Sequence, residues 1–284
     1  MTDREATPPA SGQGATSPAN GRDAAHAVVA AFAQESGAGA WRLDRAAVAD
    51  RLHVLIDTPG AIRQGSLNLC GPAAVFTVWL RHSPVAAVTY AARLFADGAT
   101  ELGRLPVTAS AALRRVPYPD SHRAQRCPQA DWMMMSALRD TTNRVLPYAS
   151  ISRWREPVAG ITLPGAVRLW LSATGLFSVV RDETNPLLRK GMRHAYQLPV
   201  GGGTEVLALI AMEMLRRPAS RLRRARDLVV ALVPNHWVVL RSPVVRTAEG
   251  RVRVQLWTWG EEYSVELPES RFRRCYFGAL VGRK

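Results

Sequence analysis

The sequence predicts an α+β protein in which an N-terminal helical half packs against a C-terminal antiparallel β-sheet half. Two observations lead to this fold class. Between residues 41 and 215, the apolar segments mostly have helical length and are separated by proline and glycine. From Leu228 onward, short runs rich in Val, Leu and Trp alternate with turn residues, as hairpin-connected strands do. Helices followed by strands are typical of the α+β class.

The folded domain is expected over residues 41–284. Residues 1–40 are interpreted as a disordered or weakly helical leader, because residues 1–22 are rich in small and polar residues while 24–34 favour a helix. Helices are predicted near residues 41–55, 73–80, 85–95, 131–138, 164–174 and 206–215. Proline in a first turn and glycine after a last turn support several of these bounds.

The C-terminal half supplies the strands. They are predicted over residues 229–233, 236–240, 251–258 and 263–267, with a shorter one over 177–181. Ala248-Glu249-Gly250 is a turn sequence and predicts a hairpin before the third of these strands. No internal repeat is present.

A cysteine stands at the start of the helix predicted over 73–80. Cys70 is followed by Gly71 and Pro72, and proline suits the first turn of a helix because its missing N–H would be unpaired there. The N–H dipoles at a helix N-terminus favour a thiolate, which is the nucleophilic form of cysteine. Gln64, six residues upstream, has an amide that can donate to an oxyanion forming beside the sulfur.

A nucleophilic cysteine also needs a base. Among six histidines, only His236 lies inside a strongly strand-like run, where a rigid backbone would hold its imidazole. The other five lie on predicted loops or helix edges and are interpreted as surface residues. Cys70 and His236 are far apart in sequence, so the pair requires that the fold bring them together.

These segments resemble papain-like cysteine peptidases. Gln64-Gly65-Ser66 with a cysteine six residues after the glutamine is similar to the family's active-site segment, and Cys70-Gly71-Pro72-Ala73 is closer to bacteriocin-processing bacterial peptidases. Residues 235–240 resemble the histidine strand, and residues 257–260 resemble the family's Asn-Ser-Trp-Gly segment. The resemblance implies a papain-like catalytic domain in which Gln64 is the oxyanion donor, Cys70 the nucleophile and His236 the general base.

The sequence departs from the family at the residue that orients the histidine. Trp257 stands where the family has asparagine. We consider Gln255 as a substitute, because residues two apart on a strand point the same way, and Thr258 as a weaker one.

The expected function is that of a cysteine-dependent amide hydrolase or acyl-transferase, either a thiol peptidase or a glutamine deamidase, acting on a protein or peptide. The module resembles bacterial effectors or toxins. The alternative is a catalytically weak papain-like pseudoenzyme that acts as a binding module, because the asparagine is absent. A third hypothesis, binding of nucleic acid, is motivated by the net charge of +14 and the arginine-rich segment 216–226. No nucleic-acid recognition motif is present, so no specific nucleic-acid partner is expected.

Composition sets further limits. The three cysteines are widely spaced and odd in number, which fits a reducing compartment better than a disulfide framework. No metal-ligand spacing or phosphate-binding loop occurs, so neither a metal nor a cofactor is expected. The sequence has no apolar run of transmembrane length and no secretory signal pattern. We therefore expect a cytoplasmic protein, or one exported by a system that needs no signal peptide.

Overall fold

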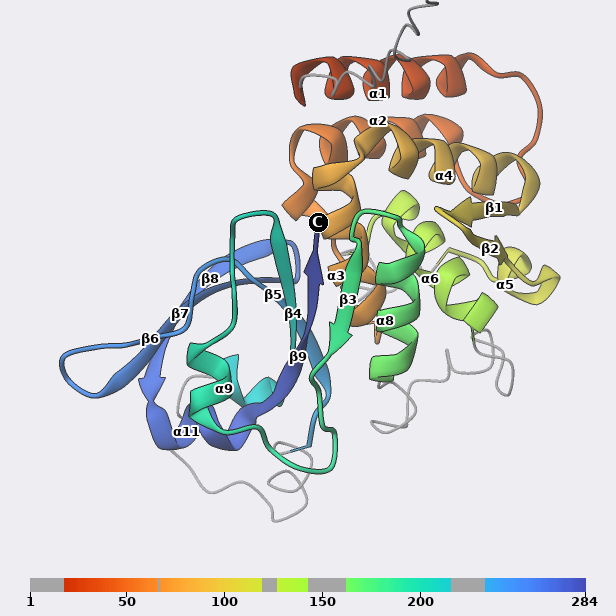
Figure 1. The fold of residues 1–284 in the computed structure, drawn as a ribbon. Helices are drawn as coiled ribbons and strands as arrows, with labels where there is room; N and C mark the ends of the chain where they lie inside the picture. Colours follow the sequence, from red (N-terminus) through yellow and green to blue (C-terminus); the bar gives the residue numbers. More distant parts are fainter. Residues whose placement is uncertain (1–17, 66, 119–126, 143–161, 216–232) are drawn as a thin grey trace, which may run out of the picture.

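The computed structural model of the chain describes residues 18–65, 67–118, 127–142, 162–215 and 233–284. In these residues, helices of the N-terminal half pack against a C-terminal antiparallel sheet of seven strands (Figure 1). The predicted α+β class is confirmed. The expected strand over 229–233, except for its last residue, and the arginine-rich segment 216–226 lie outside the described residues.

The main helices of the helical half pack around one continuous core. They are α1 (Pro18–Gln34), α2 (Arg45–Asp57), η1 (Pro59–Ala61), α3 (Cys70–His82), α4 (Pro84–Asp97), α5 (Ala111–Arg115), α6 (Gln129–Thr142) and α8 (Pro164–Ala173). A hairpin of β1 (Ala99–Leu102) and β2 (Leu105–Thr108) follows α4. Among the described helices, none is both long and apolar enough to cross a membrane.

Helix α1 makes the folded part start earlier than residue 41. Its buried residues Ala25, Val29 and Phe32 recur at intervals of four and three, which places them on one helix face. Phe32 packs edge-on against Phe95 of α4, and the Arg45 guanidinium lies 4.8 Å from the centroid of each ring. A short but continuous apolar stripe therefore packs α1 against α2 and α4. The small residues around this stripe make it hard to recognise in the sequence.

The sheet is entirely antiparallel in the described residues, in the order β3-β9-β4-β5-β7-β6, with β8 paired to β7. Its strands are β3 (Val179–Asp182), β4 (Thr204–Ile210), β5 (His236–Leu240), β6 (Val245–Arg246), β7 (Arg251–Thr258), β8 (Glu261–Pro268) and β9 (Tyr276–Arg283). In the described part of this half, three short helices accompany the sheet: α9 (Met192–Tyr196), η2 (Met212–Leu215) and α11 (Glu269–Cys275). The strands predicted over 236–240, 251–258 and 263–267 are confirmed within a few residues.

The helix predicted over residues 206–215 is wrong. This segment forms β4 and then the single 3-10 turn η2. Strand β4 lies inside the sheet between β9 and β5, and all of its residues from Glu205 to Ile210 are buried. A strand covered on both faces shows no alternation of apolar and polar residues, so its pattern cannot be told from that of a buried helix.

Helix α3 lies where the two halves meet and packs against β5 (Figure 1). Every residue from Cys70 to Leu80 is buried, so this helix has no solvent-facing side until its last turn. Two indole N–H groups of the sheet extend the junction. Trp237 of β5 donates to the Thr162 carbonyl at 2.9 Å, and Trp257 of β7 donates to the Gly60 carbonyl at 2.7 Å.

Candidate active site around Cys70 and His236

Cys70 is the first residue of α3, as the sequence predicts, and only 5 % of its surface is exposed. Burial raises the pKa of the Cys70 thiol. The Trp237 backbone N–H, the charge of Arg139 and the N–H groups of Gly71 and Cys70 itself act in the opposite direction. The helix N-terminus thus favours the thiolate as expected, but burial outweighs it. The resting thiol is protonated at neutral pH.

His236 is the first residue of β5 and is 1 % exposed. Its Nε2 lies 2.6 Å from Thr258 Oγ1, and its ring stacks on the indole of Trp259 with 4.7 Å between the ring centroids. Burial lowers the pKa of His236 to about 3, so the imidazole is neutral at physiological pH. Because Nε2 is engaged by the hydroxyl, Nδ1 is the nitrogen left to exchange a proton with another group.

The fold brings Cys70 next to the backbone of the residue that follows His236. The contact is the hydrogen bond from the Trp237 N–H to the Cys70 thiol, supported by the packing of α3 on β5. Within the described residues, no hydrogen bond links the Cys70 sulfur directly to the His236 imidazole. Burial keeps both groups neutral, so they do not form a thiolate–imidazolium ion pair in this structure.

Thr258, and not Gln255, contacts the histidine. In the β5–β7 pairing, Val239 lies opposite Trp257 and Leu240 opposite Leu256. Since side chains alternate along a strand, Thr258 shares the sheet face of His236, whereas Gln255 belongs to the other face. Gln255 is exposed, and its backbone N–H is bound by the Ser242 hydroxyl at 2.8 Å. The structure thus corrects the assignment of Gln255 as the orienting residue.

The turn after Thr258 connects the histidine to the segment that carries Gln64. Trp259 has a φ of 53°, and Gly260 has a φ of 86°. A Cβ on Gly260 would lie 3.1 Å from the Ile62 carbonyl oxygen, so this turn presses against the chain just before Gln64. Gln64 is 6 % exposed, and within the described residues its side-chain amide makes no hydrogen bond. The amide N–H groups are therefore free to donate to a reacting oxygen.

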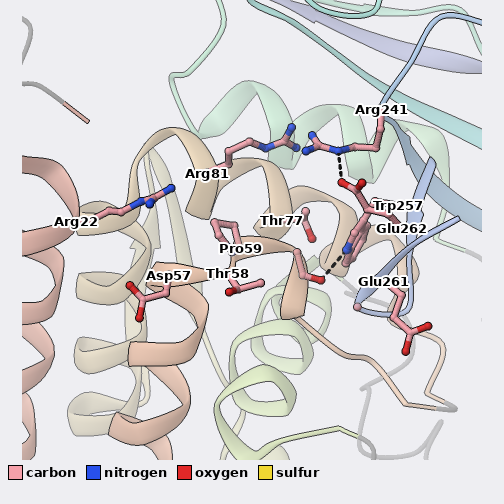
Figure 2. Close-up of a pocket in the computed structure, with 12 residues that line it drawn as sticks. Arg22, Asp57, Thr58, Pro59, Thr77, Arg81, Arg241, Trp257, Glu261 and Glu262 are labelled. Atoms are coloured by element: carbon pink, nitrogen blue, oxygen red, sulfur yellow. Dashed lines mark hydrogen bonds and ion pairs between the residues drawn. The ribbon is translucent and has the colours of Figure 1, made fainter. Parts of the chain in front are cut away.

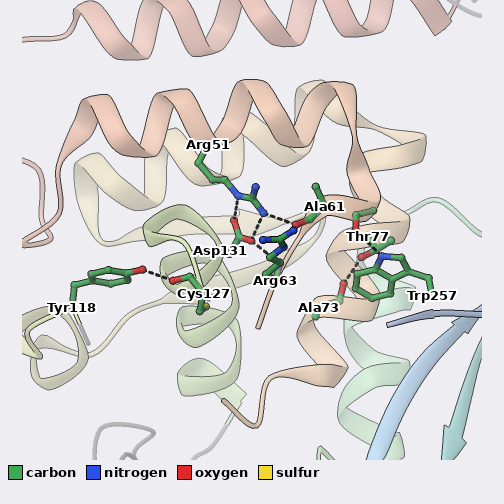
Figure 3. Close-up of polar contacts among 10 residues, drawn as sticks. Arg51, Ala61, Arg63, Ala73, Thr77, Tyr118, Cys127, Asp131 and Trp257 are labelled. Carbon is green, nitrogen blue, oxygen red and sulfur yellow. Dashed lines mark hydrogen bonds and ion pairs between the residues drawn. The ribbon is translucent and has the colours of Figure 1, made fainter. Parts of the chain in front are cut away.

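Helix α6 holds the Gln64 segment at its beginning. The Asp131 carboxylate is fully buried and receives Arg51 Nε at 2.9 Å, Arg51 Nη2 at 2.8 Å and the Arg63 backbone N–H at 2.7 Å (Figure 3). Arg51 Nη2 also donates to the Ala61 carbonyl. One buried carboxylate thus joins α2, α6 and the residues immediately before Gln64.

The same helix holds the segment at its end. The Arg139 side chain is buried, and its Nη1 donates to the Asn68 carbonyl and to Thr162 Oγ1. Thr162 in turn lies against Gly71, because a Cβ on Gly71 would be 2.7 Å from Thr162 Cγ2. Asp131 and Arg139 are eight residues apart and thus lie near one face of the helix, so α6 fixes both ends of the loop between Gln64 and Cys70.

The sequence analysis did not identify Arg139 or Thr162 as part of this site, whereas Trp259 lies in the segment 257–260 that resembles Asn-Ser-Trp-Gly. A signal exists for Arg139, because Asp131 and Arg139 are charged residues that flank the otherwise uncharged run Trp132–Leu138. Buried charges are paired or functional far more often than apolar residues are. Thr162 has no comparable signal, since a contact between distant segments places it.

Two more observations bear on the chemistry. Among the described residues, no group of three or more His, Cys, Asp or Glu side chains is arranged to hold a metal ion. Cys127 and Cys275 are free, buried thiols, and burial raises the pKa of each.

Comparison with known proteins finds no matching family model, no similar curated protein and no similar solved structure.

Proposed function

We propose that the protein is a cysteine-dependent amide hydrolase or acyl-transferase with a papain-like arrangement of its site. The observation that carries the proposal is the position of a helix-initiating cysteine beside the strand residue after a histidine whose Nε2 is held by a hydroxyl. The oxyanion segment lies just before the cysteine, and the histidine strand pairs with the strand of its orienting residue. The resemblance of the segments that carry Gln64, Cys70 and His236 to those of papain-like peptidases also supports the proposal.

The reaction starts from neutral partners. His236 Nδ1 takes the Cys70 proton as the sulfur attacks the amide carbonyl carbon, so the thiolate and imidazolium form during attack rather than before it. The Gln64 amide and the Cys70 N–H stabilise the negative oxygen of the tetrahedral intermediate. His236 then gives its proton to the leaving nitrogen, and a thioester remains. Water or another amine attacks the thioester and releases the acyl group.

The substrate is a protein or peptide amide. Attack on a main-chain amide releases a new amino terminus, whereas attack on a glutamine side chain releases ammonia and leaves glutamate. The two products are measured separately, by N-terminal labelling and by an ammonia assay. We further propose that the protein acts as a bacterial effector or toxin, which rests on the resemblance alone.

The test is labelling by a thiol-directed probe such as iodoacetamide bearing a fluorophore. We expect the wild-type protein to be labelled, Cys70→Ala to lose the label, and Cys127→Ala and Cys275→Ala to retain it. The His236→Ala variant should react more slowly at neutral pH, because no base remains to remove the thiol proton. Equal labelling of wild type and Cys70→Ala would contradict the proposal.

The second candidate is a pseudoenzyme that keeps this architecture as a binding module. The exposed fractions of 5 % for Cys70 and 1 % for His236 favour it, as does the absence of a direct hydrogen bond between them in the described residues. Under this hypothesis the wild-type protein stays unlabelled between pH 6 and pH 9 while folded. Its Cys70→Ala variant then binds any partner with unchanged affinity.

A further inference from the structure

A cavity of about 400 Å³ lies at the junction of the helical half and the sheet. Its walls come from the end of α2, from η1, from the second half of α3 and from the β7–β8 hairpin (Figure 2). Cys70, His236 and Gln64 do not line it. Its size falls within the range of small-molecule sites in proteins.

Three arginines from three separate elements surround this cavity. Arg22 comes from α1, Arg81 from the last turn of α3 and Arg241 from the residue after β5. Figure 2 shows the guanidinium groups of Arg81 and Arg241 pointing toward one another. Two positive charges that face each other repel, and the repulsion grows where solvent is partly excluded. An anion placed near both groups would reverse the sign of this interaction.

Some N–H donors of these arginines have no hydrogen-bond acceptor among the described residues. Arg81 Nη1 pairs with Glu205 at 3.3 Å, but Arg81 Nη2 is buried and has no hydrogen-bond partner. A buried N–H group without an acceptor is unfavourable, because its hydrogen bond to water is lost and no protein acceptor replaces it. Arg22 is exposed and forms no ion pair with any described residue. Two of the three arginines therefore have donors that no described residue satisfies.

The acidic residues of the cavity are already engaged. Glu262 accepts from Arg241 at 2.9 Å, and Asp57 lies 2.9 Å from His26 Nε2. Glu261 is exposed and lies 3.4 Å from the Tyr263 hydroxyl. The formal charges of the lining side chains balance. The lining groups that remain without partners in the described part of the chain are nevertheless N–H donors of arginines, which would bind an anion.

We propose that this cavity binds a small organic molecule that bears a phosphate or carboxylate group. The anionic group lies between Arg81 and Arg241, where both guanidiniums donate to it. The organic part lies against Pro59 and Trp257, whose indole is held in place by its bond to the Gly60 carbonyl. The cavity is larger than an inorganic anion needs, which is why an attached organic group is part of the proposal.

The experiment is titration calorimetry on the full-length protein with phenyl phosphate and with benzoate as probes. Phenol and inorganic phosphate each supply half of the chemistry and should bind at least about tenfold more weakly than phenyl phosphate. Arg81→Gln and Arg241→Gln should each weaken phenyl phosphate binding at least about tenfold. Both variants should fold, because Glu205 keeps His82 at 2.7 Å and Glu262 is a surface residue.

Arg253→Gln is the matched control, since Arg253 is an exposed arginine of β7 that pairs with Glu266 outside the cavity. The affinity of the Arg253→Gln variant for phenyl phosphate should equal that of the wild-type protein. Preference for phenyl phosphate over benzoate, or the reverse, identifies the anionic group. Tighter binding of benzylamine than of either anion, no binding of either anion at millimolar concentration, or equal losses in Arg253→Gln and Arg81→Gln would overturn the proposal. None of these measurements depends on the chemistry at Cys70.

Discussion

The contact between Thr258 and His236 shows how one side chain limits the chemistry of its neighbour. Asparagine and aspartate oxygens only accept hydrogen bonds, so they select the imidazole tautomer with the proton on Nε2. A threonine hydroxyl both donates and accepts, and it holds Nε2 at 2.6 Å without selecting either tautomer. Only the tautomer with a free lone pair on Nδ1 is a base toward Cys70.

This difference yields a prediction for position 258. Thr258→Val removes the hydrogen bond and should slow alkylation of Cys70 at pH 7 by roughly five- to tenfold, which corresponds to about 1 kcal/mol. Thr258→Asn supplies an acceptor and should react at least as fast as wild type. The rates are measured with iodoacetamide under pseudo-first-order conditions. A Thr258→Val variant that reacts at the wild-type rate would show that the hydroxyl has no part in proton transfer.

His236 should also make stability depend on pH. Its pKa is lowered to about 3 in the folded protein, against about 6.5 in the unfolded chain. Between these values the unfolded state binds the proton and the folded state does not, so acidification favours unfolding. The stabilising effect of the neutral imidazole is complete above pH 6.5 and is lost as the pH falls toward 3.

The measurement compares wild type with His236→Gln in urea unfolding at pH 7, 6, 5 and 4. The wild-type free energy of unfolding should fall more steeply with acid, by up to about 1.4 kcal/mol for each pH unit below 6.5. The difference between the two proteins therefore changes in favour of the variant as pH decreases. Parallel curves would mean that His236 titrates equally in both states.

At the scale of elements, α6 is the feature on which the position of Gln64 depends. Asp131→Ala leaves the Arg51 charge without its carboxylate and the Arg63 N–H without its acceptor. We expect a loss of about 3–5 kcal/mol in the free energy of unfolding. Arg51→Met combined with Asp131→Leu should cost less than Asp131→Ala alone, since no buried charge remains.

The control for this comparison is the surface ion pair of Arg253 and Glu266. Both side chains are partly exposed, at 56 % and 37 %, so Glu266→Ala should change stability by less than about 1 kcal/mol. Denaturant unfolding of the variants measures these differences. If Asp131→Ala and Glu266→Ala were equally stable, the buried carboxylate would not anchor the loop.

The junction of α3 with the segment before α8 depends on the absence of a side chain at Gly71. Gly71→Ala would bring a Cβ to 2.7 Å from Thr162 Cγ2 and 2.9 Å from Thr162 Cβ. Overpacking of this kind costs about 1–3 kcal/mol. Gly165→Ala in α8 meets no atom within 4 Å and should be neutral or slightly stabilising. Thermal unfolding of the two alanine variants distinguishes them, and a similar shift in both would remove the steric argument.

Most helices and strands can be predicted from the sequence where one of their faces is buried and the other is exposed. Strand β7 alternates in burial along its first half, and the helices from α3 to α8 have proline or glycine near their ends. Strands β4 and β9 are buried on both faces, so no alternation marks them. At the site, the residue pattern and the family resemblance single out Cys70 and His236 as the proposed nucleophile and base. The choice of Thr258 over Gln255 depends on register, which only the pairing of β5 with β7 reveals.

At the scale of the whole molecule, the two halves share one core. The buried apolar residues form a single cluster from Ala25 of α1 to Val281 of β9. Helix α3 contributes to both layers, and Trp237 and Trp257 tie the sheet to carbonyls of the helical half. We therefore expect the halves to unfold together.

The prediction is checked by following urea unfolding with far-ultraviolet circular dichroism and with tryptophan fluorescence. Trp41 and Trp132 of the helical half and Trp237 and Trp257 of the sheet should report the same midpoint as the backbone signal. Two separated midpoints would mean that the sheet and the helices are independent folding units.

The place of β9 in the sheet determines the order in which the chain can assemble. This strand, residues 276–283, lies between β3 and β4 and is the only partner of β3 in the described residues. During synthesis, β3 emerges about a hundred residues before its partner exists. Until then its hydrogen-bonding edge, and that of β4, are open to other chains, so a ribosome-bound chain should need protection from aggregation late in its synthesis.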